Sequence, residues 1–245
     1  AERIEKLLTE TDYLQPKTRA TELVNNFIKP GLEDLCVSRT TFKWGIPVTF
    51  DDKHVVYVWI DALSNYISAL GFWNEQYNDF DKFWPADVHM VAKDIMRFHA
   101  IIWPAMLMAL DLPLPKHLAV HGWITFNGQK MSKSLGNGIM PDEIIQQYGA
   151  DILRLWVASS DYHSDIRISK AILQQLSDAY KKIRNTARYI LGNLGNGAGF
   201  NPDTDMVSDD QLHELDRWAL IRLDRLIDKV HEGYTNFDFH VVFHS

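Results

Sequence analysis

The chain has 245 residues, of which 46% are hydrophobic and 23% charged, and these values exclude wholesale disorder. A formal net charge of −7 argues against a module that only binds nucleic acid. The single cysteine, Cys36, excludes an intramolecular disulfide and a site of several thiolates. No apolar stretch is long enough to span a membrane. These two observations lead us to expect a cytoplasmic protein.

The first half of the chain alternates helix and strand patterns. Helical patterns cover the first residues and 18–26. Runs of β-branched, aromatic and other apolar residues predict three buried strands, at 55–59, 88–91 and 118–121. Helical spacing follows the first two runs, at 60–70 and 94–110. Strands joined by helices through short connections predict right-handed crossovers and a parallel sheet.

Ligands of such sheets bind beyond the carboxyl ends of the strands. Segments 59–62, 92–94 and 121–123 follow the three predicted strands and carry polar or aromatic side chains. We therefore expect a pocket where these three segments meet.

Helix patterns dominate after about residue 140. They cover 142–148, 150–158, 169–194 and 211–234, and a loop rich in Gly and Asn spans 192–202. Segment 170–194 carries five basic residues against one acidic residue, a local charge of +4 in an acidic chain. The sequence thus predicts an α/β half followed by an all-helical half.

The strongest chemical signal is Lys130-Met131-Ser132-Lys133-Ser134, which continues into Leu135-Gly136-Asn137. Two lysines three residues apart on a loop of small residues place two ammonium groups on one polyphosphate, and hydroxyls and backbone amides add donors. Such a pair can neutralise the charge that develops on a leaving pyrophosphate. The alternative is a solvated surface loop.

This lysine motif, following His121-Gly122-Trp123, resembles a signature of the class I aminoacyl-tRNA synthetases. Upstream segments are similar to the bacterial methionyl-tRNA synthetases, at 25–34, 44–48, 57–66 and 97–104. Later segments are similar to the isoleucyl-tRNA synthetases instead, at 148–162, 165–169, 182–188 and 214–220. A change of resemblance at about residue 135 indicates a chimera of two related synthetases, with a single divergent enzyme as the alternative.

The resemblance implies the second half of a Rossmann-like parallel-sheet catalytic domain, followed by an all-α bundle of the anticodon-binding type. The implied domains are the end of a connective insertion, the C-terminal half of the nucleotide-binding domain, a helical linker and a truncated tRNA anticodon-binding domain. Their bounds are 1–35, 36–140, 141–175 and 176–245.

The resemblance also implies an amino-acid pocket made by Trp59, Ala62, Leu63, Tyr66, Ile95, His99 and Trp103. Aromatic walls suit a thioether side chain, because sulfur makes favourable contacts with rings. His99 could hydrogen-bond Tyr66 or the sulfur. The alternative for each aromatic residue is ordinary core packing.

The implied catalytic residues are Lys130 and Lys133. The implied ATP site contains these two lysines together with Asp94, His121, Gly122, Trp123, Met131, Ser132 and Ser134. Asp94 would bind ribose hydroxyls or cap a helix. ATP would bring Mg²⁺ with it. The ten histidines lack metal-ligand spacing and the family's cysteine-based zinc knuckle is expected upstream, so we expect no zinc ligand here.

In the helical half, the resemblance implies contacts with tRNA phosphates. The implied residues are Lys181, Lys182, Arg184, Arg188, Arg217 and Trp218. A solvated helix face is the alternative for each of them.

The function implied is that of a methionine–tRNA ligase fragment, which activates methionine with ATP and transfers it to tRNA. We expect the chain to be an internal fragment that is inactive alone, because the family's His-Ile-Gly-His-like signature is not among its residues. The alternatives are an isoleucine–tRNA ligase with the matching tRNA, and a non-catalytic tRNA-binding module. No membrane partner is expected.

Overall fold

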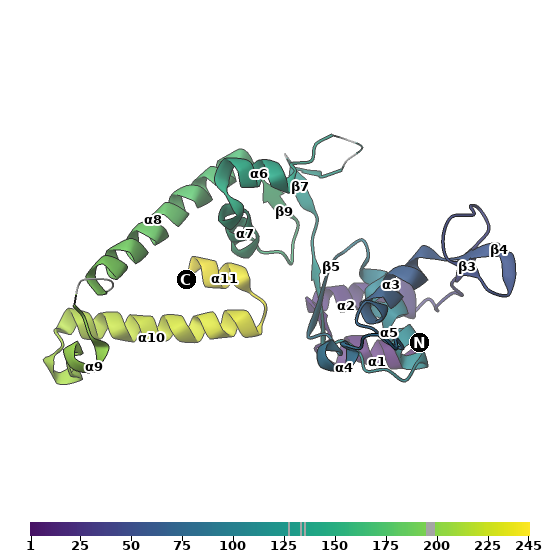
Figure 1. Cartoon of the computed structure of the whole chain (residues 1–245), viewed down its shortest axis with the longest axis horizontal. Coiled ribbons are helices and arrows are strands. Elements are labelled where there is room, and N and C mark those ends of the chain that lie inside the picture. The colour runs from purple at the N-terminus through teal and green to yellow at the C-terminus, as the bar shows by residue number, and fades with distance from the viewer. Residues whose placement is uncertain (127, 133, 135, 195–198) are drawn as a thin grey trace. The chain divides into compact units, whose positions relative to one another are not determined.

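The computed structural model describes residues 1–126, 128–132, 134, 136–194 and 199–245 (Figure 1). The chain divides into two compact units, Ala1–Gly122 and Trp123–Ser245. This division falls earlier than the change of character expected near residue 140. The second lysine of the signature, Lys133, lies outside the described residues.

A three-stranded parallel sheet forms the centre of unit 1. Strand β6 (His117–His121) lies between β1 (Leu14–Gln15) and β5 (Val88–Ala92), and both pairings are parallel. The strands predicted at 88–91 and 118–121 are therefore confirmed. The register aligns Ala92 with His121, so both strands end at the same edge of the sheet.

Helices cover this sheet and enclose its core. They are α1 (Glu2–Glu10), α2 (Lys17–Leu23), the π-helical η1 (Val24–Ile28), α3 (Val58–Ser68), α4 (Phe80–Phe83), the π-helical η2 (Phe98–Ile102) and α5 (Trp103–Ala109). One core cluster joins α1, α2 and the sheet through residues such as Leu8, Leu23 and Leu118. Each of these side chains is fully buried, which stabilises the unit by about 1.5–3 kcal/mol per side chain.

The strand predicted at 55–59 was wrong in extent and in partners. Strand β4 (Asp51–Val56) pairs antiparallel with β2 (Ser38–Arg39) and β3 (Pro47–Val48), in a sheet separate from the parallel one. Helix α3 already begins at Val58, so Trp59 lies in its first turn. A short apolar run does not separate strand from helix by periodicity, and here the helical spacing of the following residues extends back into it.

The helix predicted at 94–110 is divided. The backbone N–H of Trp103 donates to the Phe98 carbonyl, which is π-helical spacing, before α5 continues. Pro104 explains the change, because it has no N–H to complete an α-helical bond to the residue four positions earlier. The wider turn carries His99, and such π-turns often occur at functional sites.

Unit 2 combines a small sheet with helices. Strand β7 (Ile124–Phe126) pairs antiparallel with β8 (Gln129–Lys130) and parallel with β9 (Ile166–Ile168). The helices are α6 (Pro141–Tyr148), α7 (Ala150–Ser159), α8 (Lys170–Leu194), α9 (Pro202–Asp205), the 3₁₀-helix η4 (Asp209–Gln211), α10 (Glu214–Thr235) and α11 (Phe239–His244).

The four helices predicted after residue 140 are confirmed as α6, α7, α8 and α10. The prediction that this half is all-helical was wrong at β9, whose three residues are too few to show a strand period. The core of unit 2 packs Ile168 of β9 against Ile144, Ile152, Trp156 and Leu173 of the helices. Within the described residues, none of the helices has both the length and the apolar character needed to cross a membrane.

Candidate functional site

Aromatic side chains from three elements of unit 1 form one cluster. Tyr66 of α3 contacts Trp103 of α5, with ring centroids 5.9 Å apart, and lies 5.7 Å from the ring of His99. The Tyr66 hydroxyl and His99 Nε2 are 2.9 Å apart. Trp103 is fully buried and Tyr66 is half-buried, so the cluster reaches from the core to the surface.

His99 is fixed in one tautomer by its backbone surroundings. Its Nδ1 lies 3.0 Å from the carbonyl oxygen of Ile95, which can only accept, so Nδ1 carries the proton. Burial lowers the pKa of His99, and the ring is therefore neutral at pH 7. Nε2 must then accept, and the Tyr66 hydroxyl donates to it. The Tyr13 hydroxyl donates to the backbone carbonyl of His99 at 3.0 Å and holds this residue from another side.

The other predicted pocket residues lie at different depths. Trp59 is half-buried, stacks on Phe98 at 4.0 Å and meets His99 edge to face at 6.2 Å. Leu63 is fully buried in the same cluster as Trp103. Ile95 is half-buried, and Ala62 is exposed on α3. The structure therefore brings Trp59, Tyr66, His99 and Trp103 together and leaves Ala62 at the surface.

One residue of this cluster, His89, was not predicted from the sequence. His89 of β5 is 7% exposed, and its ring lies 4.3 Å from that of Tyr66 and 6.4 Å from that of His99. Burial, followed by the neighbouring His99, lowers the pKa of His89 to about 4. Its position on the buried face of a strand gave no sign of a site.

The depressed pKa of His89 predicts that acid destabilises the fold. Because an unfolded histidine titrates near pH 6.5, the unfolded chain binds more protons than the folded chain between about pH 4 and 6.5. The free energy of unfolding should fall by up to about 3 kcal/mol as the pH decreases through this window. Urea unfolding at several pH values measures this change in the free energy of unfolding. His89→Phe lacks the titrating imidazole, so its free energy of unfolding should fall less over the same pH range. Equal losses in the wild-type protein and the variant would contradict the prediction.

The predicted nucleotide residues of unit 1 lie where β5 and β6 end. His121 is the last residue of β6, and its Nδ1 donates to the Gly122 carbonyl at 2.8 Å. Asp94 is exposed in the turn after β5, where the Ile95 N–H donates to the Ala92 carbonyl. Asp94 thus lies at the expected edge of the sheet, before the helical residues that begin at Met96.

The lysine signature follows a hairpin of unit 2. Lys130 lies on β8, and its ammonium group lies 3.2 Å from the centroid of the Trp123 ring. The Trp123 N–H donates to Asp165 Oδ1 at 2.8 Å, which fixes the backbone beside β9. The Ser132 and Ser134 hydroxyls are hydrogen-bonded at 2.7 Å, and Met131 is half-buried against the core of unit 2. A cation on an indole face is an attractive contact.

Asn137 closes this loop and was missed as a functional candidate. Its Oδ1 accepts from the Ser132 N–H at 2.8 Å, and its Nδ2 donates to the Lys130 carbonyl at 3.1 Å. One side chain thus holds both ends of the first three residues of the signature. The only sign in the sequence is that Asn137 follows the lysine motif closely, four residues after Lys133.

Asn137→Ala should loosen the loop and reduce the rate of amino-acid activation about tenfold, because two hydrogen bonds are lost at about 0.5–1.5 kcal/mol each. The measurement is ATP–pyrophosphate exchange by the full-length gene product. Asn137→Asp keeps the acceptor for Ser132 and loses the donor to Lys130, so an intermediate rate is expected. Wild-type rates in both variants would show that the loop needs no such clasp.

The predicted tRNA-contacting residues are all exposed. Lys181, Arg184 and Arg188 are spaced three and four residues apart on α8, so they share one face, with Lys182 beside them. Lys181 pairs with Asp178 at 3.1 Å. On α10, Arg217 donates to the Asp210 carbonyl at 3.1 Å, and Trp218 is 59% exposed.

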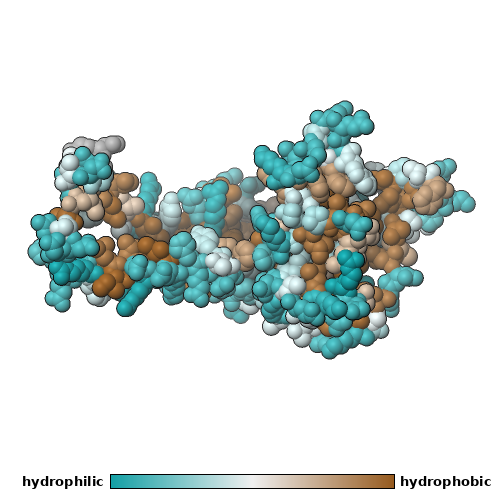
Figure 2. Space-filling model, turned by 90° about the horizontal axis from the view of Figure 1, so that it is seen from below, coloured by the Kyte–Doolittle hydropathy of each residue, from teal (hydrophilic) through white to brown (hydrophobic). Residues whose placement is uncertain are grey.

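Exposed apolar side chains accompany these charges along α10. The exposed large hydrophobic residues of this helix include Leu215, Trp218, Ile221 and Leu223. Hydrophobic surface over this helix is visible at the left of Figure 2. A hollow of about 440 Å³ borders Glu214, Leu215 and Trp218. This helix therefore exposes apolar side chains as well as basic groups.

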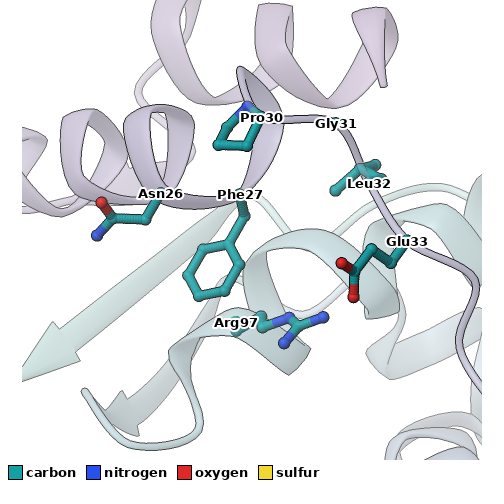
Figure 3. Close-up of a pocket in the computed structure, with 7 residues that line it drawn as sticks. All are labelled: Asn26, Phe27, Pro30, Gly31, Leu32, Glu33 and Arg97. Atoms are coloured by element: carbon teal, nitrogen blue, oxygen red, sulfur yellow. The ribbon is translucent and has the colours of Figure 1, made fainter.

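A separate hollow of about 220 Å³ opens on unit 1 (Figure 3). It is lined by Asn26, Phe27, Pro30, Gly31, Leu32, Glu33 and Arg97. The Arg97 guanidinium lies over the Phe27 ring, 4.7 Å from its centroid.

Within the described ranges, no group of three or more His, Cys, Asp or Glu side chains could hold a metal ion.

Comparison with known proteins identifies the family of the chain. The family model of the class I tRNA synthetases (M) matches residues 1–188. The chain belongs to this family. Methionine–tRNA ligase of Clostridium acetobutylicum is 50% identical over 196 residues, which are 79% of this chain and 30% of that relative. The ligase of Caldanaerobacter subterraneus subsp. tengcongensis is 61% identical over 146 residues, 60% of this chain and 23% of that relative.

Solved structures of this synthetase family share the fold. Mycobacterium tuberculosis methionyl-tRNA synthetase in complex with methionyl-adenylate superposes with a TM-score of 0.83 and 33% identity, covering 99% of this chain and 48% of that one. The chain thus spans less than a third of the two curated relatives and about half of the solved chain.

The family match also bears on the proposed join. It extends past residue 135 as far as 188, and the methionyl structure covers nearly the whole chain. The isoleucine alternative, and with it the change of family near residue 135, receives no support from these comparisons.

Proposed function

We propose that this chain is part of a methionine–tRNA ligase, which activates methionine with ATP and transfers it to tRNA. The observation that carries the proposal is the neutral Tyr66–His99 pair beside Trp59 and Trp103, in a chain whose relatives are methionine–tRNA ligases. A thioether is unbranched, polarizable and only a weak acceptor. Rings and an uncharged polar pair suit it better than a fixed charge would.

In the first step, a methionine carboxylate oxygen forms a bond to the α-phosphorus of ATP, and the bond to pyrophosphate breaks. Negative charge develops on the leaving pyrophosphate, where a positioned cation stabilises the transition state. Lys130 and Lys133 are the proposed cations, and Ser132 and Ser134 offer hydroxyl donors. In the second step, a hydroxyl of the terminal tRNA ribose attacks the activated carbonyl and AMP leaves.

The same proposal assigns the remaining predicted residues. Asp94, His121, Gly122 and Trp123 would contact the nucleotide, and Mg²⁺ would enter with ATP, with no protein residue assigned as its ligand. Ala62, Leu63 and Ile95 would complete the methionine pocket. The exposed basic face of α8 and residues Arg217 and Trp218 would contact tRNA. The reaction would take place in the cytoplasm.

We propose the finer architecture on the same grounds. The parallel sheet of unit 1 would be the second half of a Rossmann-like domain. The domain bounds would be 1–35, 36–140, 141–175 and 176–245, with the last segment entering an anticodon-binding helical bundle. The long helices α8 and α10 support the last assignment.

The test is ATP–pyrophosphate exchange by the full-length gene product with methionine or isoleucine. Methionine should drive exchange, and isoleucine should do so poorly, because its β-branch does not fit a pocket for a straight chain. Differences of one methylene are worth only about 1–3 kcal/mol, so a preference of about 10–200-fold is expected for each such difference. Exchange driven by isoleucine alone would favour the isoleucine enzyme. No exchange with either, together with tRNA binding, would favour a non-catalytic module.

A further inference from the structure

His89 is a buried residue of the aromatic cluster for which the proposed reaction has no role. It lies on β5 with a side chain that is more than nine-tenths buried. Its Nδ1 atom is buried and has no hydrogen-bond partner among the residues that the structure describes. Because no hydrogen bond holds Nδ1, the ring acts on its neighbours through packing.

The principal neighbour is Tyr66. The two ring centroids are 4.3 Å apart, with an interplanar angle of 32°, so the rings are in contact and tilted against each other. Trp84 meets the imidazole edge to face, with the ring centroids 6.0 Å apart, and Trp84 in turn contacts Trp103. His89 therefore packs against the Tyr66 ring and against Trp84.

The two side chains of the Tyr66–His99 hydrogen bond differ in the other contacts that fix their positions. His99 is fixed independently, by its Nδ1 bond to Ile95 and by the Tyr13 hydroxyl on its carbonyl. Tyr66 is half-buried, and its phenol is positioned by the bond to His99 and by ring contacts. Loss of a ring contact would therefore move Tyr66 and leave His99 in place.

We propose that His89 is a positioning residue of the amino-acid pocket, whose ring supports Tyr66 so that the phenol stays hydrogen-bonded to His99. This inference rests on the proposed function for its substrate, methionine. It assigns His89 no contact with the substrate. Its effect on methionine binding passes through Tyr66.

The experiment is a double-mutant cycle on the full-length gene product, measured by methionine-dependent ATP–pyrophosphate exchange. His89→Ala should raise the KM for methionine about tenfold, the value of one hydrogen bond, with kcat and the KM for ATP changed less than about twofold. Tyr66→Phe removes the same hydrogen bond and should raise the KM similarly. If His89 acts through Tyr66, the double variant should be no worse than Tyr66→Phe alone.

Two further variants separate positioning from general packing. His89→Phe keeps a flat ring beside Tyr66 and should retain a KM for methionine near the wild-type value. Val91→Ala is the matched control, because Val91 is buried on the same strand but belongs to the other core cluster, and it should leave that KM unchanged. His89→Leu, which fills the volume without a flat ring, replaces His89→Ala in the cycle should the latter not fold.

Additive effects in the cycle would overturn the inference, as would an unchanged KM in His89→Ala or equal damage from His89→Phe. These outcomes differ from a failure of the proposed function. In that case the wild-type enzyme itself would show no methionine-dependent exchange.

Discussion

Lys133→Ala in the full-length gene product is expected to lower the rate of methionine-dependent ATP–pyrophosphate exchange by about 10²–10³-fold. The physical reason is the charge that develops on the leaving pyrophosphate. A positioned donor at such a charge is typically worth about 3–4 kcal/mol. The folded state should be little changed, which far-ultraviolet circular dichroism and the thermal midpoint can establish.

Two other lysines serve as comparisons. Lys130→Ala should also slow exchange, but less, and it should release the Trp123 ring from its cation contact. Lys6 is exposed on α1, where it pairs with Glu2, so Lys6→Ala should exchange at the wild-type rate. An exchange rate near wild type in Lys133→Ala would remove this lysine from the mechanism.

The regular elements of the fold were predictable because their periods are long or their runs are well bounded. The helices α6, α7, α8 and α10 follow their hydrophobic spacing, and β5 and β6 follow short apolar runs bounded by polar residues. The failures lie where one pattern runs into another. At 55–59 a strand gives way to a helix within three residues, so the apolar run spans both.

The sequence predicted the candidate site as a set of residues, and of its hydrogen bonds only the one between His99 and Tyr66, as one of two alternatives for His99. The family resemblance supplied Tyr66 and His99, and the structure adds which atom donates to which. Tyr13 reaches the His99 carbonyl from 86 positions away in the chain, and no spacing in the sequence could indicate that contact. The lysine loop shows the opposite case, since Asn137 is local to it but its two hydrogen bonds depend on the bend of the backbone.

Trp103 could serve as an ordinary core residue or as a wall of the methionine pocket, and the free energy of unfolding of Trp103 variants separates these two interpretations. It is fully buried, and its ring contacts both Tyr66 and Trp84, so removing it should leave a large cavity. Trp103→Ala should lower the free energy of unfolding by about 3–5 kcal/mol, measured by urea unfolding. Trp103→Phe should cost less, because a ring still fills most of the space.

The matched control is a tryptophan without such packing. Trp218 is 59% exposed on α10, so Trp218→Ala should change the free energy of unfolding by no more than about 0.5 kcal/mol. A cost below about 1 kcal/mol for Trp103→Ala would show that the cluster collapses around the lost ring. Trp103 would then act chiefly as a wall of the methionine pocket, because a residue that the core needs cannot be removed at so small a cost.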